Sequence, residues 1–224
     1  MAGTSVKPPS TDRHAVSARE IHHRVKNSLQ VIASILRLQM RREPSTEAQQ
    51  ALSGAIQRIL GLVQVHELLS NDDRSEVPLR ELLARLLALN TEHFLMPGQV
   101  IHPSVEGPEL SVDAVAAQSI GIIVNELIVN ALKHAFSGAE EGRLVARARL
   151  GEGRLEIEVA DDGTGLPPDF TLTGDSNLGL RLVRSILGED LLGEFDLRRD
   201  GGWTVARLRF PWPPRTVTPV EPEE

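Results

Sequence analysis

The chain has 224 residues, which at about 150 residues per domain allows one large domain or two small ones. Hydrophobic residues make up 41% and charged residues 25%, a composition typical of a folded globular protein. Cysteine is absent, which excludes disulfides, thiolate nucleophiles and cysteine-ligated metal sites. The formal net charge of −7 argues against a general nucleic-acid-binding protein, because such proteins present a basic surface to phosphate.

The N-terminal segment is polar, contains Pro8 and Pro9, and has no apolar stretch of the kind found in export signals. Apolar stretches elsewhere are interrupted by Asn, Glu or Arg within a few residues, far short of the ~20 residues that span a bilayer. The sequence therefore predicts a cytoplasmic protein without membrane insertion. We expect disordered tails over residues 1–16 and 214–224, which are rich in proline and polar residues.

Two amphipathic helices are predicted in the first third of the chain. Over residues 17–42 apolar residues recur at spacings of three and four, and a break at Pro44 separates them from a second periodic run. Two long helices with a short connection predict an antiparallel hairpin over residues 17–75. A hairpin alone buries one stripe on each helix, so we expect a homodimer in which two hairpins form a four-helix bundle. The stripes expected to need the partner hairpin are formed by Leu29, Ile32 and Leu36, and by Ile56, Ile59 and Leu62.

The pattern changes to a mixture of helices and strands over residues 76–213. Helices are predicted at residues 79–93, 112–136 and 178–187. Strands are predicted at residues 99–105, 144–150, 154–160, 194–199 and 204–210. Helices followed by a hairpin-rich sheet predict an α+β fold, here a two-layer α/β sandwich that follows the helical hairpin.

The first polar constellation is the segment HHRVKN at residues 22–27. On a helix, His23 and Asn27 lie four residues apart on one face, as do His22 and Lys26. Apolar residues occupy another face, so at least one imidazole should project into solvent. Neighbouring histidines diverge on a helix, which disfavours a zinc site. By itself the segment is also compatible with a solvated basic helix face.

The second constellation is the segment NELIVNALKHA at residues 125–135, on the long predicted helix. Four polar residues at spacings of three and four form one stripe on it: Glu126, Asn130, Lys133 and His134. Together, such groups suit Mg²⁺ and phosphate oxygens, since hard cations take oxygen ligands. A solvated face is the alternative, although unpaired polar groups would be costly on a helix that is otherwise apolar enough to be buried.

Two glycine-containing segments follow. The segment ADDGTGLP at residues 160–167 comes directly after a predicted strand. Its glycines allow a backbone to approach a planar ligand, and its carboxylate can accept a hydrogen bond from an exocyclic amine. The segment NLGLRL at residues 177–182 places a glycine turn before a helix, whose N-terminal amides attract phosphate. Each is a weak signal alone, because Asp-Gly turns are common and no P-loop pattern is present.

In this order and spacing, the four segments resemble those of the two-domain sensor histidine kinases. The first is similar to the phosphoacceptor motif of a subfamily with HRVKN, close to the HWE kinases. The other three resemble the N, G1 and G2 boxes of an ATP-binding domain similar to that of gyrase, the heat-shock chaperones and the mismatch-repair ATPases. The resemblance covers roughly residues 18–211, and Lys26 and Lys133, two of only three lysines, lie inside these motifs.

The resemblance implies roles for individual residues. His23 matches the phosphorylated histidine, with Asn27 on the same helical face. Asn130 matches the asparagine that coordinates Mg²⁺, and Glu126 is implied as a catalytic residue that holds Mg²⁺ through water. Asp161 matches the aspartate that reads adenine. The other residues implied to bind ATP are Lys133, His134, Gly163, Gly165, Gly179, Leu180 and Thr204.

The sequence departs from the family pattern in three places. Arg24 follows the histidine where the commonest kinase families have an acid, although arginine is usual in this subfamily. Asn177 replaces the first glycine of the second box, at the end of residues 166–177, which correspond to the ATP lid. Trp203 spreads the closing Gly-Gly-Thr over residues 201–204. The chain also lacks the Trp-x-Glu signature of the HWE kinases.

The predicted function is that of an ATP-dependent protein histidine kinase of a two-component system. The resemblance implies that a neutral His23 attacks the γ-phosphorus of Mg·ATP and that the phosphoryl group then passes to an aspartate of a response regulator. Too few residues precede the first helix to form a sensor domain, so we expect the input from a longer protein or a separate sensor protein. The alternatives are a non-catalytic histidine phosphotransferase and a binding module with the same ATP-binding fold, such as an anti-sigma factor.

Overall fold

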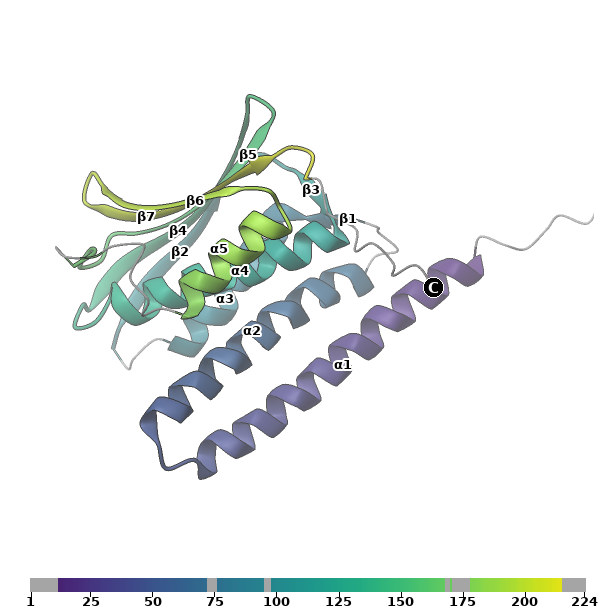
Figure 1. Ribbon diagram of the computed structural model, residues 1–224, viewed down its shortest axis with the longest axis horizontal. Coiled ribbons are helices and arrows are strands. Elements are labelled where there is room, and N and C mark those ends of the chain that lie inside the picture. The colour runs from purple at the N-terminus through teal and green to yellow at the C-terminus, as the bar shows by residue number, and fades with distance from the viewer. Residues whose placement is uncertain (1–11, 72–75, 95–97, 168–169, 171–177, 215–224) are drawn as a thin grey trace, which may run out of the picture.

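The structure is a computed structural model that describes residues 12–71, 76–94, 98–167, 170 and 178–214. It begins with two long helices, α1 (Asp12–Arg42) and α2 (Thr46–Asn71), which lie antiparallel along one side of the molecule (Figure 1). Ser45 is the N-cap of α2, because its hydroxyl accepts a hydrogen bond from the N–H of Ala48 at 3.3 Å. The predicted hairpin is confirmed, with α1 beginning five residues earlier than its periodicity indicates.

A sheet covered by helices follows the hairpin. The helices of this sandwich are α3 (Leu79–Phe94), α4 (Ala114–His134) and α5 (Leu178–Glu189). Its sheet is formed by β2 (Val100–Glu106), β4 (Glu141–Gly151), β5 (Arg154–Asp161), β6 (Glu194–Asp200) and β7 (Trp203–Pro211). Two short strands, β1 (Glu76–Pro78) and β3 (Ser111–Asp113), pair with each other apart from this sheet. The predicted α+β fold is confirmed; the small β1–β3 ribbon was not expected.

The sheet has the strand order β2-β4-β5-β7-β6. The edge strand β2 is parallel to β4, and the remaining neighbours are antiparallel. Helices α3, α4 and α5 all lie on one face of the sheet (Figure 1). The central strand β5 ends at Asp161 beside the start of β7, so the segment after β5 leaves the sheet next to the C-terminal end of α4.

Helix α4 is the centre of the sandwich. It begins at Ala114 rather than at residue 112, because residues 111–113 pair with β1 and Asp113 then caps the helix. The Asp113 carboxylate accepts a hydrogen bond from the N–H of Ala116 at 2.8 Å, an N-cap worth about 1 kcal/mol. Among the described residues, only α4 is long and apolar enough to cross a membrane by length and composition, and 67% of that window is buried inside the fold.

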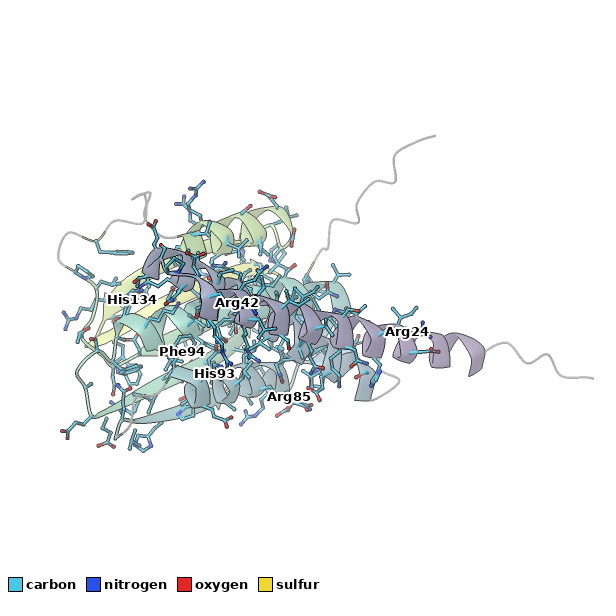
Figure 2. All side chains as sticks on the ribbon, turned by 90° about the horizontal axis from the view of Figure 1, so that it is seen from below. Arg24, Arg42, Arg85, His93, Phe94 and His134 are labelled. Carbon is cyan, nitrogen blue, oxygen red and sulfur yellow. The ribbon has the colours of Figure 1, made fainter. Side chains whose placement is uncertain are left out.

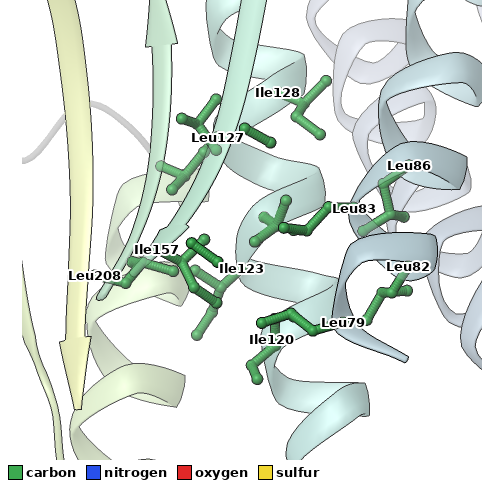
Figure 3. Packing of buried hydrophobic residues seen from close by; sticks show 14 of the residues in the cluster. Leu79, Leu82, Leu83, Leu86, Ile120, Ile123, Leu127, Ile128, Ile157 and Leu208 are labelled. Atoms are coloured by element: carbon green, nitrogen blue, oxygen red, sulfur yellow. The ribbon is translucent and has the colours of Figure 1, made fainter. Parts of the chain in front are cut away.

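The hydrophobic core lies on both sides of α4. Figure 3 shows leucines of α3 packed against isoleucines of α4, whose other side contacts β5 and β7. The labelled core residues with less than 1% exposure are Leu82, Leu83, Leu86, Ile120, Ile123, Ile128, Ile157 and Leu208. Each such side chain contributes about 1.5–3 kcal/mol by leaving water, so this core fixes the position of α4 relative to the sheet.

Helix α2 also packs against α4, so the hairpin and the sandwich share one core. Val65, Leu68 and Leu69 belong to the same buried cluster as the α4 residues. Two glycines allow the helices to approach closely: a Cβ on Gly121 would lie 2.8 Å from Val65, and one on Gly61 would lie 3.1 Å from the side chain of Asn125. The sequence predicted no such contact, since it assigned the apolar residues of α2 to a partner hairpin.

The apolar surface that stays exposed on the hairpin differs from the predicted one. On α2, Ile56 is only 3% exposed, because this helix is covered within its own chain. On α1, Leu29 and Leu36 are half-buried. The exposed apolar side chains form a stripe, here called the α1 stripe, of Val31, Ile32, Ile35 and Leu38. Ile59 and Leu62 are half-buried, and Ile32 is exposed as predicted. The expectation that α2 needs a partner hairpin is therefore corrected for Ile56, and the exposed apolar surface of the hairpin lies on α1.

Candidate active site

A cavity of about 400 Å³ lies between α4, the ends of β5 and β7, and the segment after β5. It is called the Asp161 cavity here. Apolar side chains from the helix and the sheet form much of its wall, among them Leu127, Val159 and Leu197. Predicted site residues that line it are Asn130, His134, Asp161, Gly165, Leu180 and Thr204. An apolar cavity with a few polar groups is the usual form of a small-molecule site.

Asp161 is the polar end of this cavity. It is the last residue of β5 and pairs across the sheet with Thr204. Its carboxylate is buried and accepts hydrogen bonds from the N–H of Gly163 at 3.2 Å and from the Thr204 hydroxyl. Burial raises the pKa of Asp161 to about 6, and these hydrogen bonds oppose that rise. A carboxylate at the wall of an apolar cavity is suited to accept a hydrogen bond from an amine of a planar ligand.

The two glycines after Asp161 have different tasks. Gly163 lies against the end of α4, where a Cβ would come within 2.2 Å of the Ala135 carbonyl oxygen. The next residue, Thr164, donates its N–H to that same carbonyl at 2.9 Å. Gly165 lines the cavity and has a φ of 83°, which favours glycine. Gly163 thus serves packing between loop and helix, whereas the sequence suggested close approach to a ligand for both.

The polar stripe of α4 is divided between two surroundings. Asn130 and His134 line the Asp161 cavity, and the Nδ2 of Asn130 is buried without a hydrogen-bond partner in the described part of the chain. Glu126 instead faces α2, and Lys133 lies with its Nζ 5.5 Å from the centre of the Phe94 ring. At about 100° per residue, Asn130 and His134 fall on one edge of the stripe and the other two on the opposite edge. Burial lowers the pKa of Lys133.

The second glycine segment contributes through the start of α5. Leu180 lines the cavity, and Gly179 is buried in the first helical turn without lining it. Most of the predicted lid, with Asn177 at its end, lies outside the described residues. The described residues therefore define the wall of the cavity formed by α4, β5, β7 and α5.

The candidate phosphoacceptor lies on α1. His23 is exposed, and its Nδ1 lies 3.3 Å from the Nδ2 of Asn27, so the predicted pair on one helical face is present. His22 is half-buried, and its Nδ1 lies 3.2 Å from the Nδ1 of His66 on α2. Lys26 forms an ion pair of 3.8 Å with Glu67. The two adjacent histidines therefore differ: His22 faces the hairpin interior, and His23 faces solvent.

The fold does not bring His23 to the Asp161 cavity. Figure 2 shows Arg24, the neighbour of His23, toward one end of the molecule and His134 toward the other. Arg42, at the far end of the same helix, lies closer to His134 in this view. The predicted sites on the hairpin and on the sandwich are therefore separate in this arrangement of the chain.

Two polar residues near these sites were not singled out from the sequence. Arg58 on α2 forms an ion pair with Glu126, and the buried His66 contacts His22. Both are polar residues that interrupt the apolar faces of α2, and this interruption is the sequence feature that could have identified them. That signal does not indicate a partner, because the partners lie 68 and 44 residues away along the chain.

Two family models match the chain. The one described as "Histidine kinase" matches residues 20–93, and the one described as "Histidine kinase-, DNA gyrase B-, and HSP90-like ATPase" matches residues 116–214. The chain is 36% identical over 196 residues to the sensor histidine kinase PdtaS of Mycobacterium tuberculosis, which covers 86% of this chain and 39% of that protein. It is 30% identical over 213 residues to the blue-light-activated histidine kinase 2 of Erythrobacter litoralis, covering 93% and 61%. The chain thus spans less than two thirds of the length of each of these relatives.

Solved structures have the same architecture. The histidine kinase domain of the Erythrobacter litoralis blue-light-activated histidine kinase superposes with a TM-score of 0.63 at 26% identity, covering 89% of this chain and 94% of that domain. The catalytic domain of the histidine kinase ThkA superposes with a TM-score of 0.51 at 20% identity, covering 62% of this chain, which shows a shared fold. The first match extends over both the hairpin and the sandwich.

Proposed function

This chain belongs to the histidine kinases, and from that premise we propose that it phosphorylates His23 with ATP bound in the Asp161 cavity. The observation that carries the proposal is that one chain contains both a cavity suited to a nucleotide and an exposed histidine suited to accept phosphate. The sandwich has a cavity with Asp161 at one end and Asn130 on its wall. The hairpin presents an exposed His23 beside Asn27. The proposed domains are the hairpin at residues 17–75 and the ATP-binding sandwich at residues 76–213, between tails at residues 1–16 and 214–224.

The cavity suits a nucleotide. The Asp161 carboxylate accepts a hydrogen bond from the exocyclic amine of adenine, and apolar walls cover the faces of the base. Gly165, Leu180, Thr204 and His134 line the same cavity. Lys133 and His134 are the side chains proposed to face the phosphates. Gly163 and Gly179 are proposed to act by shaping the two segments that enclose the nucleotide.

Asn130 fits a role as a ligand of Mg²⁺, because its side chain lines the cavity and an amide offers a carbonyl oxygen, the type of ligand that Mg²⁺ prefers. Glu126 fits a water-mediated contact only after it leaves Arg58, which occupies both of its carboxylate oxygens here. Mg²⁺ bound with ATP supplies neutralisation of the charge on the phosphate oxygens. We propose both Mg²⁺ and ATP as cofactors.

In the proposed reaction, the Nε2 lone pair of His23 attacks the γ-phosphorus, the bond from phosphorus to the bridging oxygen breaks, and ADP leaves. The Nδ1 proton is then lost to water, which leaves a neutral imidazole ring that carries the phosphoryl group on Nε2. Asn27 is the residue proposed to orient this imidazole: its Nδ2 lies 3.3 Å from Nδ1, and a flip of the side-chain amide would place Oδ1 there to accept the Nδ1–H, which keeps the lone pair on Nε2. His23 and the cavity lie apart here, so transfer requires another placement of the sandwich or the histidine of a second copy.

The α1 stripe supports a homodimer. Its four side chains are between 45% and 58% exposed, and contiguous apolar surface of this kind marks an interaction site. We propose that two hairpins meet through these stripes in a four-helix bundle. The phosphoryl group is proposed to pass from His23 to an aspartate of a response regulator receiver domain. The input is proposed to come from a sensor protein or region, and the reaction to take place in the cytoplasm without nucleic acid or membrane insertion.

The two alternative functions are less well supported. A non-catalytic phosphotransferase has no use for the cavity residues, and these are present together. An anti-sigma-like binding module has no use for the histidine-bearing hairpin, which lies within the "Histidine kinase" match. Neither alternative has an observation of its own that favours it.

The test is incubation of the chain with γ-labelled ATP and Mg²⁺. We expect an acid-labile, base-stable label on His23. His23→Ala should abolish the label while nucleotide binding survives, and His22→Ala serves as the matched control. Loss of the label in His22→Ala with retention in His23→Ala would show that the acceptor is wrongly assigned. Absence of any label on the wild-type chain would contradict the kinase proposal.

A further inference from the structure

The hairpin and the sandwich meet at an ion pair between α2 and α4. The Arg58 Nε lies 2.8 Å from Oε1 of Glu126, and Nη2 donates to Oε2 at 3.0 Å. The side chain of Glu126 is 6% exposed and that of Arg58 is 24% exposed. Only the Nη2 contact is a hydrogen bond, because Nε has no hydrogen-bond partner among the described residues, and removal of Arg58 would leave the charge of Glu126 buried. The pair therefore links the two units strongly in this arrangement.

Neighbouring contacts hold the ion pair in place. The side chain of Asn125 donates from Nδ2 to the Gln57 carbonyl at 3.2 Å, and its Oδ1 accepts from Asn90 Nδ2 at 2.9 Å. One turn further along α2, Gly61 leaves room for Asn125, which a Cβ would approach to 3.1 Å. These contacts fix the register of α2 along α4, in which Arg58 meets Glu126.

The ion pair affects the polar stripe of α4. Glu126 lies one helical turn before Asn130, which lines the Asp161 cavity. The charges of Glu126 and Arg58 both act on the pKa of Lys133, which burial lowers, Glu126 raises and Arg58 lowers further. Arg58 is therefore close to the stripe, although it does not line the cavity. While Glu126 is paired with Arg58 and buried against α2, it is not presented to a metal-bound water or to an incoming imidazole.

We propose that the Arg58–Glu126 ion pair is an autoinhibitory latch between the hairpin and the ATP-binding sandwich. In the latched arrangement Glu126 is engaged, and Arg24, the neighbour of His23, lies toward the opposite end of the molecule from His134 of the cavity (Figure 2). Phosphoryl transfer requires the latch to open, which frees Glu126 and allows the sandwich to leave its contact with α2. The inference rests on the proposed function, since it concerns the rate of that reaction.

The test compares variants of the full chain. Arg58→Met removes the charge at similar length, and Gly61→Leu separates the helices sterically without a change of charge. Arg58→Lys keeps the charge on a head group of different shape, so a smaller effect is expected. Arg42→Met, at an exposed arginine of α1, is the matched control. The initial labelling rate at saturating Mg·ATP, the affinity for a fluorescent ATP analogue and the unfolding temperature are measured for each.

We expect Arg58→Met and Gly61→Leu to raise the initial rate about fivefold or more, the lower end of ordinary coupling between two sites. The affinity for the ATP analogue should stay unchanged, because neither residue lines the cavity. The control should keep the wild-type rate. If Arg58→Met does not fold, Gly61→Leu and Arg58→Lys decide the question.

Slower labelling in Arg58→Met at unchanged nucleotide affinity and unfolding temperature would overturn the latch, because Arg58 would then assist the transfer. Unchanged rates in both variants would overturn it as well. These outcomes differ from failure of the proposed function, in which the wild-type chain takes up no label. If the wild-type chain takes up label but the variants do not label faster, the latch proposal is wrong and the proposed function still stands.

Discussion

Single residues of the cavity combine structural and binding tasks. The Asp161 carboxylate closes the turn after β5 through the N–H of Gly163 and remains at the wall of the cavity. The same burial that makes it a selective acceptor disfavours its charge, which raises its pKa to about 6. Two consequences can be measured, one on nucleotide affinity and one on stability.

Asp161→Asn should weaken ATP binding with little effect on dimerisation. An amide in place of the carboxylate disturbs a charge-assisted hydrogen bond to the adenine amine, worth about 1.5–3 kcal/mol, or roughly ten- to hundredfold in affinity. Isothermal titration of ATP into both proteins measures this difference. GTP, which has a carbonyl in place of that amine, should compete poorly with ATP for the wild-type chain. Equal affinity for the two nucleotides would contradict a role of Asp161 in reading adenine.

The stability of the nucleotide-free chain should depend on pH through Asp161. Its folded-state pKa of about 6 lies above its ordinary value of 3.8, so the folded state binds the proton more tightly than the unfolded chain. The resulting stabilisation is fully present below about pH 4 and is lost as pH rises through about 6, by about 3 kcal/mol for this group. Urea unfolding of the wild type and Asp161→Asn between pH 4 and 8 measures it. The free energy of unfolding of the variant should rise relative to that of the wild type as pH rises. If the two free energies change in parallel with pH, Asp161 does not titrate in this range.

At the scale of helices and strands, α1 has an apolar face that no other part of the described chain covers. Leu29 and Leu36 are half-buried in the hairpin, while the α1 stripe stays exposed. Helix α2, by contrast, is covered by α1 on one side and by α4 on the other. The dimer contact is therefore expected from α1 rather than from both helices equally.

Ile35→Glu should convert the proposed dimer into a monomer. The side chain is 51% exposed in the single chain, and a carboxylate there would be buried without a partner in the bundle. Light scattering after size-exclusion chromatography at micromolar concentration measures the mass. Gln30→Glu, an exposed position on α1 beside the stripe, is the control and should stay dimeric. A dimer that survives Ile35→Glu would show that the interface lies elsewhere.

At the scale of the whole molecule, the hairpin and the sandwich are less independent than two domains joined by a linker. Val65, Leu68 and Leu69 of α2 are buried in the core of the sandwich. The residues that line the Asp161 cavity all belong to the sandwich itself, between residues 127 and 206. The stability of the sandwich should therefore depend on α2. The proposed nucleotide site should not, because none of its lining residues belongs to α2.

A fragment of residues 77–213 should bind ATP as a monomer and should not label itself, since it lacks His23. It should unfold at a lower temperature than a fragment of residues 44–213, which keeps α2. Loss of the contacts of three buried apolar side chains corresponds to several kcal/mol, about 1.5–3 for each residue. Thermal unfolding with and without ATP compares the two fragments. Equal unfolding temperatures would show that α2 adds nothing to the sandwich.

Local sequence patterns determined most of the elements. Periodicity of three and four predicted α1, α2 and α4, and alternation with glycine turns predicted the hairpins β4–β5 and β6–β7. These patterns act over a few residues, which is the range that a sequence window covers. The spacing of residue types likewise determined the four motifs, and the placement of Asn130, Asp161 and Leu180 around one cavity agrees with the order of those motifs.

Only the tertiary structure decided what each polar residue faces. The sequence placed Glu126 and Asn130 on one stripe, but the contact of α2 with α4 directs Glu126 to Arg58 while Asn130 lines the cavity. It likewise decided that His22 meets His66, that β2 lies parallel to β4, and that His23 lies away from the cavity. The physical reason is that periodicity determines which residues share a face of a helix. Which element covers that face depends on packing between segments distant in the chain, and no local spacing encodes it.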